Sequence, residues 1–180
     1  AINPRLRLSA AVSAAGGAPL DETDWLNTVP YSTSLQDWRG WLEEGSLDLA
    51  LPMIYRDPDE YPGQFELWSD WAKDHQYDRG AVIGTGAYKN EIAASMEQWL
   101  DTRRPSAQGH SALGLIGYSY ATTNDEGAPR RDFVNAAVSE VFSQPALTPL
   151  LPWLDTPTLG HLMGTLTPTL SCLPLLDGLA

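Results

Sequence analysis

The stretch SLQDWRGWLEEGSLDLALPMIY, residues 34–55, carries the pattern that decides the fold. Ser34 begins a capping-box pattern, Ser-Leu-Gln-Asp, and Gly45 is placed to stop a helix. Apolar residues recur between them at helical spacing, namely Leu35, Trp38, Trp41 and Leu42. The apolar run Leu47–Tyr55 that follows is too short for a buried helix, and its near-continuous apolarity is typical of a strand in a parallel sheet. The stretch therefore predicts an amphipathic helix that leads into a buried strand.

The same alternation of short apolar runs and amphipathic segments extends over residues 6–142. The predicted strands are Leu6–Val12, Leu47–Tyr55, Gly80–Gly84 and Leu113–Tyr120. Their starts lie about 30–40 residues apart, which matches the βα units of a (β/α)8 barrel. Four such units predict an α/β fold, half of a TIM-type (β/α)8 barrel, over residues 1–144. A small doubly wound α/β domain is the alternative, and composition favours neither.

The helices between the predicted strands have recognisable ends and inward faces. Asn90 is positioned to cap a helix, and Pro129 fits a first turn. The residues expected to face inward are Phe65, Trp68, Trp71 and Ala72 in the second helix, Ile92, Met96, Trp99 and Leu100 in the third, and Phe133, Val134, Ala137, Val138 and Val141 in the fourth. After residue 144 six prolines break any long helix, so residues 145–180 are predicted to be a proline-rich linker towards a missing C-terminal module.

The composition argues against several function classes. A net charge of −12 leaves no basic stripe for a phosphate backbone, so no nucleic-acid partner is expected. No apolar run reaches the roughly 18 residues that a membrane span needs, and Ala1–Arg7 shows no signal-peptide pattern. The one cysteine, Cys172, forms no intrachain disulfide. The three histidines lie too far apart for a metal-ligand motif, so neither a metal nor another cofactor is expected.

In a barrel of this kind the working residues follow the carboxyl ends of the strands. Each of the four predicted strands is followed by aromatic side chains beside carboxylates, amides or bases. Aromatic faces stack on pyranose rings and polar side chains bind the hydroxyls, so this mixture suits a sugar. Carboxylates also supply the acid and base chemistry of glycosidic cleavage, although they are equally common at helix N-termini for electrostatic reasons. Gly84–Gly86 leaves open a phosphate-binding turn or close backbone packing.

Residues 36–45 and 47–55 resemble the family 10-like glycosyl hydrolases, which typically show a DWR-x-W-x-x-x-G helix before a strand ending in Pro-Met, an apolar residue and Tyr. The stretches 83–90 and 117–121 agree with this resemblance, which runs from about Pro4 to Phe142. Residues 156–165 are similar to the junction before the β-rich C-terminal module of these enzymes. The resemblance implies the last four units of the barrel, its C-terminal half, with an essential acid lying outside this chain.

The resemblance also implies a polysaccharide substrate, with bacterial cell-wall glycan favoured, and a secreted or cell-envelope location. Asp57 and Glu91 are the candidate catalytic carboxylates. The candidate substrate-binding residues are Trp25, Tyr55, Arg56, Tyr88, Lys89, Asn90, Tyr118 and Tyr120. The preferred hypothesis is a glycoside hydrolase of which this half grips the substrate, and the alternative is a non-catalytic glycan-binding or scaffold protein. A missing N-terminal half or a second copy of the chain is expected to cover the open sheet edges.

Overall fold

The structure is a computed structural model that describes residues 6–149, 151 and 153. The chain divides into two compact units, Ala1–Pro149 and Leu150–Ala180. Every described helix and strand belongs to the first unit. The predicted proline-rich linker, residues 145–180, lies largely outside the described residues.

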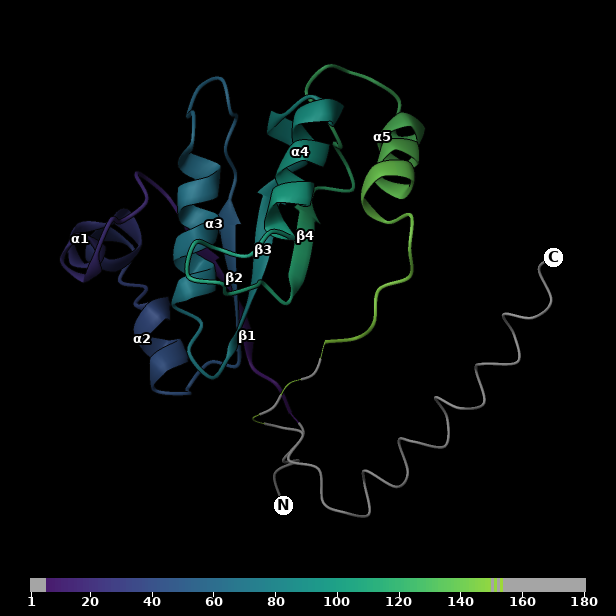
Figure 1. Cartoon of the computed structure of the whole chain (residues 1–180). Helices are drawn as coiled ribbons and strands as arrows, with labels where there is room; N and C mark the ends of the chain where they lie inside the picture. Colours follow the sequence, from purple (N-terminus) through teal and green to yellow (C-terminus); the bar gives the residue numbers. More distant parts are fainter. Residues whose placement is uncertain (1–5, 150, 152, 154–180) are drawn as a thin grey trace, which may run out of the picture. The chain divides into compact units, whose positions relative to one another are not determined.

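The first unit alternates strands and helices along the chain (Figure 1). Its strands are β1 (Ser9–Ser13), β2 (Leu49–Ile54), β3 (Gly80–Gly86) and β4 (Gly114–Tyr118). Its α-helices are α1 (Glu22–Asn27), α2 (Trp38–Glu43), α3 (Gln64–Asp74), α4 (Ile92–Thr102) and α5 (Arg130–Ala136). Shorter helical turns are η1 (Val29–Thr33), η2 (Ala87–Lys89) and η3 (Ala137–Val141). Within the described residues, no helix has both the length and the apolar character that crossing a membrane requires.

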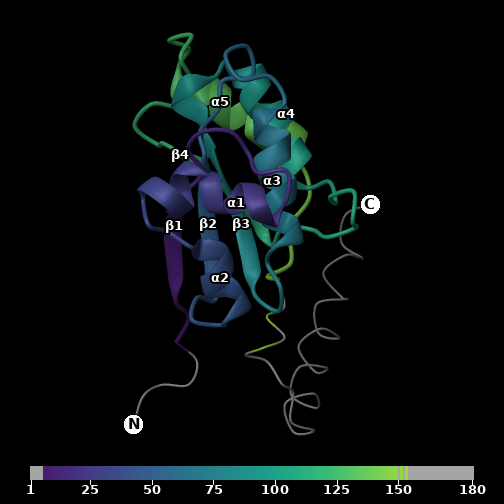
Figure 2. The ribbon, with the colours of Figure 1, turned by 90° about the vertical axis from the view of Figure 1, so that its left-hand side faces the viewer.

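The four strands form one parallel sheet in the order β1-β2-β3-β4. Connections between parallel strands are right-handed. When each new strand is added on the same side of the previous one, all the connecting helices therefore lie on one face of the sheet. Figure 2 shows α1, α2 and α3 in front of the sheet. A doubly wound domain would reverse its strand order and cover both faces. The prediction of an α/β fold with four βα units is confirmed, and the open sheet is consistent with part of a TIM-type barrel.

The two faces of the sheet differ in burial. The face under the helices is almost completely enclosed: Val12, Ala50, Ile54, Ala81 and Ile83 are at most 1% exposed. We call the other side the open face; among its residues are Ala11, Leu51, Met53, Val82, Gly114 and Ile116. These residues are partly or fully exposed, and Ile116 is 41% exposed. In a closed barrel the open face would line the interior.

Tryptophans hold the first three helices against the covered face. Trp25 meets Trp38 edge-on with ring centroids 4.9 Å apart, and it stacks on Trp71 at 6.1 Å. The Trp25 indole N–H donates to Asp37 Oδ1 at 2.9 Å, and the same oxygen accepts from the Gly40 amide at 3.0 Å. Large aromatic side chains bury much apolar area, so these contacts connect α1, α2 and α3 in one core.

Some predicted caps and inward faces are wrong in detail. Asp37 rather than Ser34 is the N-cap of α2, because its carboxylate reaches the third amide of the helix; Leu35 lies outside the helix and is 80% exposed. Asn90 does not cap α4, because Glu91 occupies the cap position. Pro129 is the N-cap of α5, and Val134 and Val138 are exposed. The contact with α4 is instead made by Phe133 of α5 and by Ala137 and Val141 of η3, which leaves these two valines outside it.

Replacing Asp37 with alanine removes a helix cap and leaves a buried indole N–H without an acceptor. We expect Asp37→Ala to lower the free energy of unfolding by about 2–3 kcal/mol, measured by urea denaturation. Asp21→Ala is the matched control, because Asp21 caps α1 by accepting from the Thr23 and Asp24 amides. The control should lose about 1 kcal/mol. Equal losses would contradict the importance of the bond to the Trp25 indole.

Candidate functional site

Three tyrosines meet where strands β2, β3 and β4 end. Tyr55 follows β2, Tyr88 lies in η2 directly after β3, and Tyr118 is the last residue of β4. The Tyr55 and Tyr118 rings stack with centroids 5.5 Å apart, while Tyr88 meets them edge-on at 6.0 and 5.8 Å respectively. Tyr118 is 53% exposed and the other two are partly buried. These three residues, the tyrosine cluster, present aromatic surface to solvent at the carboxyl end of the sheet.

Gly86 leaves the space in which two of these rings stack across β3. Strand β3 lies between β2 and β4, and Gly86 pairs with Tyr118 in the register. A Cβ at Gly86 would lie 2.8 Å from the Cβ of Tyr55. A Cβ at Gly84 would lie 2.7 Å from the Pro52 carbonyl oxygen. Gly84 lies inside β3 and Gly86 ends it, and the short contacts at both positions support the alternative of close backbone packing.

The surroundings of Tyr55 keep its phenol neutral. Burial raises the pKa of Tyr55, and the Tyr118 and Tyr88 phenols raise this pKa further. Its contribution to stability is therefore present below the unfolded pKa of about 10 and is lost as pH rises through the higher folded value. At neutral pH the cluster offers O–H groups and apolar ring faces, and both suit a sugar.

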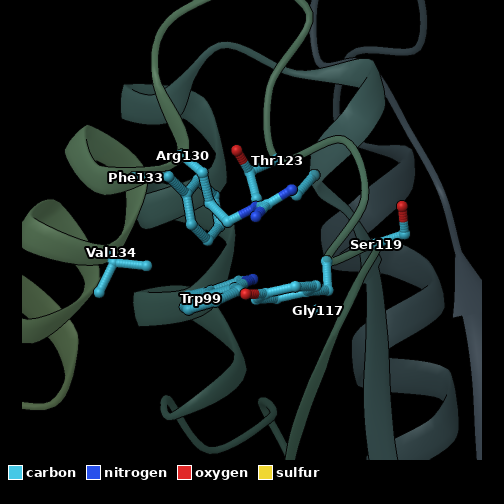
Figure 3. A pocket seen from close by; sticks show the side chains of 9 residues that line it. Trp99, Gly117, Ser119, Thr123, Arg130, Phe133 and Val134 are labelled. Carbon is cyan, nitrogen blue, oxygen red and sulfur yellow. The ribbon is translucent and has the colours of Figure 1, made fainter.

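Lys89 and Arg130 each lie over an aromatic ring near this end of the sheet. Lys89 Nζ is 5.9 Å from the Tyr88 ring centroid, and the Arg130 guanidinium carbon is 4.2 Å from that of Tyr120. Tyr120 is 78% exposed and, with Arg130, lines a cavity of about 180 Å³ beside Trp99 (Figure 3). The structure thus places Tyr120 at this cavity and leaves Lys89 beside the tyrosine cluster.

Arg56 clamps the loop that follows β1. Its Nη2 donates to the carbonyl oxygens of Ala14 and Gly16 at 2.6 and 2.7 Å. Burial lowers the pKa of Arg56, and the Tyr61 ring centroid lies 5.4 Å from its guanidinium carbon. The guanidinium expected to bind substrate is therefore bonded to the protein backbone, and it shapes the site by fixing a neighbouring loop.

The two candidate catalytic carboxylates have different surroundings. Asp57 Oδ1 accepts from the amides of Asp59 and Glu60, at 2.8 and 3.3 Å, within the turn after β2. Glu91 is exposed at the N-cap of α4, and its side chain makes no capping bond. Glu126 binds the first amide of that helix instead, at 3.1 Å. In the described part of the chain, no three or more His, Cys, Asp or Glu side chains are grouped to hold a metal ion.

Two candidate substrate-binding residues are buried. Trp25 is 1% exposed in the core, so the expectation that it contacts substrate is wrong, because none of its ring faces is open to a ligand. Asn90 is 2% exposed, and its Nδ2 donates to the Gly86 carbonyl oxygen and to Gln98 Oε1, at 3.3 and 3.2 Å. The prediction that Asn90 contacts substrate is therefore also wrong. Its buried carboxamide instead bonds the turn after β3 to helix α4.

Sequence reasoning missed Gln98 and Arg130. Gln98 lies between Met96 and Trp99 on the buried side of α4, where an uncharged amide among core residues is uncommon. A polar residue on an otherwise apolar helix face indicates a buried hydrogen bond, and the sequence shows this pattern. Arg130 has no such signal, because its ring partner Tyr120 comes from the preceding loop and only the folded chain brings them together.

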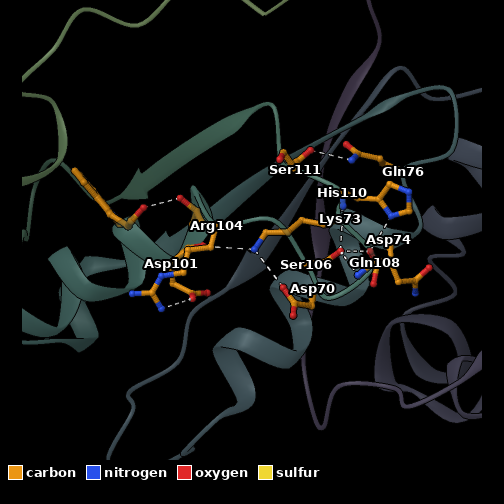
Figure 4. A network of polar contacts seen from close by, with 12 residues as sticks. Asp70, Lys73, Asp74, Gln76, Asp101, Arg104, Ser106, Gln108, His110 and Ser111 are labelled. Atoms are coloured by element: carbon orange, nitrogen blue, oxygen red, sulfur yellow. Dashed lines mark hydrogen bonds and ion pairs between the residues drawn. The ribbon is translucent and has the colours of Figure 1, made fainter.

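A polar network lies at the opposite, amino-terminal end of the strands (Figure 4). Asp74 Oδ1 accepts a hydrogen bond from Ser106 Oγ, and His110 Nδ1 lies 2.9 Å from the same oxygen. Because both groups bind one carboxylate oxygen, the serine does not pass its proton to the histidine, and the three do not form a nucleophilic triad. The buried Lys73 pairs with Asp70 at 3.2 Å. The network joins the loop before β4 to α3 and stabilises the fold.

Comparison with known proteins connects the chain to glycosyl hydrolases. No family model matches it, and no solved structure is detectably similar. Over 132 residues it is 25% identical to the protein named Glycosyl hydrolase YngK of Bacillus subtilis (strain 168). This alignment covers 69% of the chain and 25% of the relative, so the chain spans about a quarter of the length of the curated protein it matches. The similarity supports a glycosyl hydrolase-like relationship.

Adding a methyl group at Gly86 should separate the stacked rings of Tyr55 and Tyr118. We expect Gly86→Ala to weaken the tyrosine signal in near-ultraviolet circular dichroism and to lower the free energy of unfolding by about 1–3 kcal/mol. Gly114→Ala is the matched control, because Gly114 lies on the open face of β4 and a Cβ there would meet nothing within 4 Å. An unchanged spectrum in Gly86→Ala would show that the rings do not need this glycine.

Proposed function

We propose that the chain is the substrate-gripping half of a glycoside hydrolase that acts on a polysaccharide. The tyrosine cluster carries the proposal: three mutually contacting, partly exposed rings lie at the sheet end where barrel enzymes hold their substrates. The similarity to a protein named glycosyl hydrolase supports the same reaction class. The assignment to the family 10-like group rests on the resemblance of residues 36–55.

In this proposal the tyrosine rings stack on the C–H faces of pyranose units, and Lys89 binds their hydroxyls. Glu91 is the better candidate for proton transfer or nucleophilic attack, because it is exposed and free of a capping bond. Asp57 already uses one oxygen to hold its own turn. The second acid of the pair belongs to the half of the barrel outside this chain. Carboxyl groups about 5 Å apart would give a retaining reaction, and about 6.5–9.5 Å an inverting one.

We propose bacterial cell-wall glycan as the polysaccharide and a secreted or cell-envelope location for the protein. Both proposals rest on the resemblance of residues 36–45 and 47–55 to family 10-like enzymes. The location follows from the substrate, because the cell-wall polymer lies outside the cytoplasmic membrane and the enzyme must meet it there.

The open face needs a covering layer, and we propose that preceding βα units of the same protein supply it. Leu51, Met53 and Val82 are partly exposed there and Ile116 is 41% exposed, which is unfavourable in water. The relative is about four times as long as the aligned part, so similar proteins have ample chain for such units. A second copy of this chain is the alternative occupant.

Glycan binding tests the proposal directly. We expect the chain to bind purified cell-wall glycan strands in isothermal titration calorimetry, and Tyr88→Ala to weaken that binding about tenfold through loss of a stacking face. Tyr77→Ala is the control: Tyr77 is 40% exposed before β3, at the amino-terminal end of the sheet, and should leave the affinity unchanged. Absence of binding by the unaltered chain would contradict the proposal.

Release of reducing ends separates the enzyme from a glycan-binding protein, with Glu91→Gln as the informative variant. If the parent protein cleaves glycan, this substitution should reduce turnover at least about a hundredfold while binding persists. Binding with no turnover in the complete protein would favour the non-catalytic alternative, which the engagement of Asp57 in its own turn also supports.

Association tests the covering of the open face. We expect Ile116→Lys to abolish binding to a separately produced upstream half, or to a second copy, because it adds a charge to an apolar sheet face. Leu67→Lys is the control, since Leu67 is similarly exposed, at 44%, on the outer helix α3. Sedimentation velocity measures the association of both variants. An equal loss of association in Ile116→Lys and Leu67→Lys would refute the role of the open face.

A further inference from the structure

A buried pair of amide side chains joins the loops that carry the tyrosine cluster. Asn90 is 2% exposed and Gln98 is 5% exposed. Asn90 Nδ2 donates to Gln98 Oε1 at 3.2 Å and to the Gly86 carbonyl oxygen at 3.3 Å. Gln98 Nε2 donates to the carbonyl oxygen of Arg56 at 2.8 Å. The pair therefore connects the loop after β2 with the turn after β3.

The loop after β4 is bonded to Asn90 as well. The Asn90 carbonyl oxygen accepts from the Asp125 amide at 3.1 Å. The Asn90 amide donates to the Ala87 carbonyl oxygen at 3.1 Å and so closes η2. The three loops around the tyrosine cluster are thus joined through Asn90 and Gln98, and Gln98 is the only side chain bonded to the Asn90 carboxamide in the described part of the chain.

We propose that Gln98 is a positioning residue that fixes Tyr55 relative to Tyr88. Tyr55 immediately precedes the residue whose carbonyl oxygen Gln98 binds, and Tyr88 lies in the turn that Asn90 closes. The positioning of the rings stands on the structure alone, whereas their role in glycan binding rests on the proposed function.

The chemistry of the site requires a carboxamide at this position. Gln98 donates through Nε2 and accepts through Oε1 at the same time, which neither a carboxylate nor an apolar side chain does. Its helix is held firmly, because the neighbouring Trp99 donates its indole N–H to Thr85 in β3 at 2.6 Å. A rigid element beneath a binding surface holds the surface groups in a fixed geometry.

The test compares Gln98→Leu and Gln98→Glu with a control on the same helix. Thr102→Val is the control, because Thr102 is 3% exposed one turn further on and donates to the Trp99 carbonyl oxygen, not to a loop of the site. NMR contacts between the Tyr55 and Tyr88 rings, and the alkaline titration of Tyr55, report the ring geometry without any ligand. Calorimetry with cell-wall glycan strands reports binding.

Gln98→Leu should weaken the ring contacts, move the pKa of Tyr55 towards its ordinary value of about 10 and weaken glycan binding about tenfold. Gln98→Glu keeps the acceptor for Asn90 but sets a carboxylate oxygen against the Arg56 carbonyl oxygen, so it should weaken the ring contacts at least as much as Gln98→Leu. Thr102→Val should lower the melting temperature while leaving the ring signals unchanged.

Unchanged ring contacts in folded Gln98→Glu or Gln98→Leu would overturn the inference, as would equal changes in Thr102→Val. If Gln98→Leu does not fold, Gln98→Glu alone decides. Ring signals that respond to Gln98 in a chain that binds no glycan would support the positioning role and reject the proposed function, so the two failures are distinguishable.

Discussion

The hand of the crossovers between parallel strands is the constraint on which the other features of the structure depend. Right-handed connections in the unbroken order β1-β2-β3-β4 gather the helices on one face and the four carboxyl ends at one edge. Tyr55, Tyr88 and Tyr118 are far apart in the sequence, yet they make ring contacts because each closely follows or ends a strand at that edge. Within the described residues, the same constraint leaves the second face of the sheet without a helical layer.

The two ends of the sheet have different chemistry. At the amino-terminal end, Asp74 binds both Ser106 and His110, and these polar groups satisfy one another. At the carboxyl end, the tyrosine rings are partly exposed, and the exposed Glu91 makes no capping bond through its side chain. This division is the one expected of a barrel, in which one end stabilises the fold and the other binds and reacts.

Space and buried hydrogen bonds together shape the tyrosine cluster. Gly86 lacks the side chain that would displace Tyr55, so the ring is free to stack on that of Tyr118. Asn90 and Gln98 then bond the surrounding loops from beneath. An arrangement of this kind limits the movement of exposed rings before a ligand arrives, which reduces the entropy lost on binding.

The sequence by itself determined the four strands, the main helices between them and the tyrosines, because each depends on local periodicity or on position after a strand. It did not predict the short helix α1. Phe65, Trp68, Trp71 and Ala72 are buried as their helical spacing predicts. Only the tertiary structure decided that Trp25 enters the core, that Asn90 turns inward and that Gln98 joins the loops. The burial of Trp25 in the short helix α1, and the partner of a buried amide, depend on which distant segments pack over them, and local sequence spacing does not specify those segments.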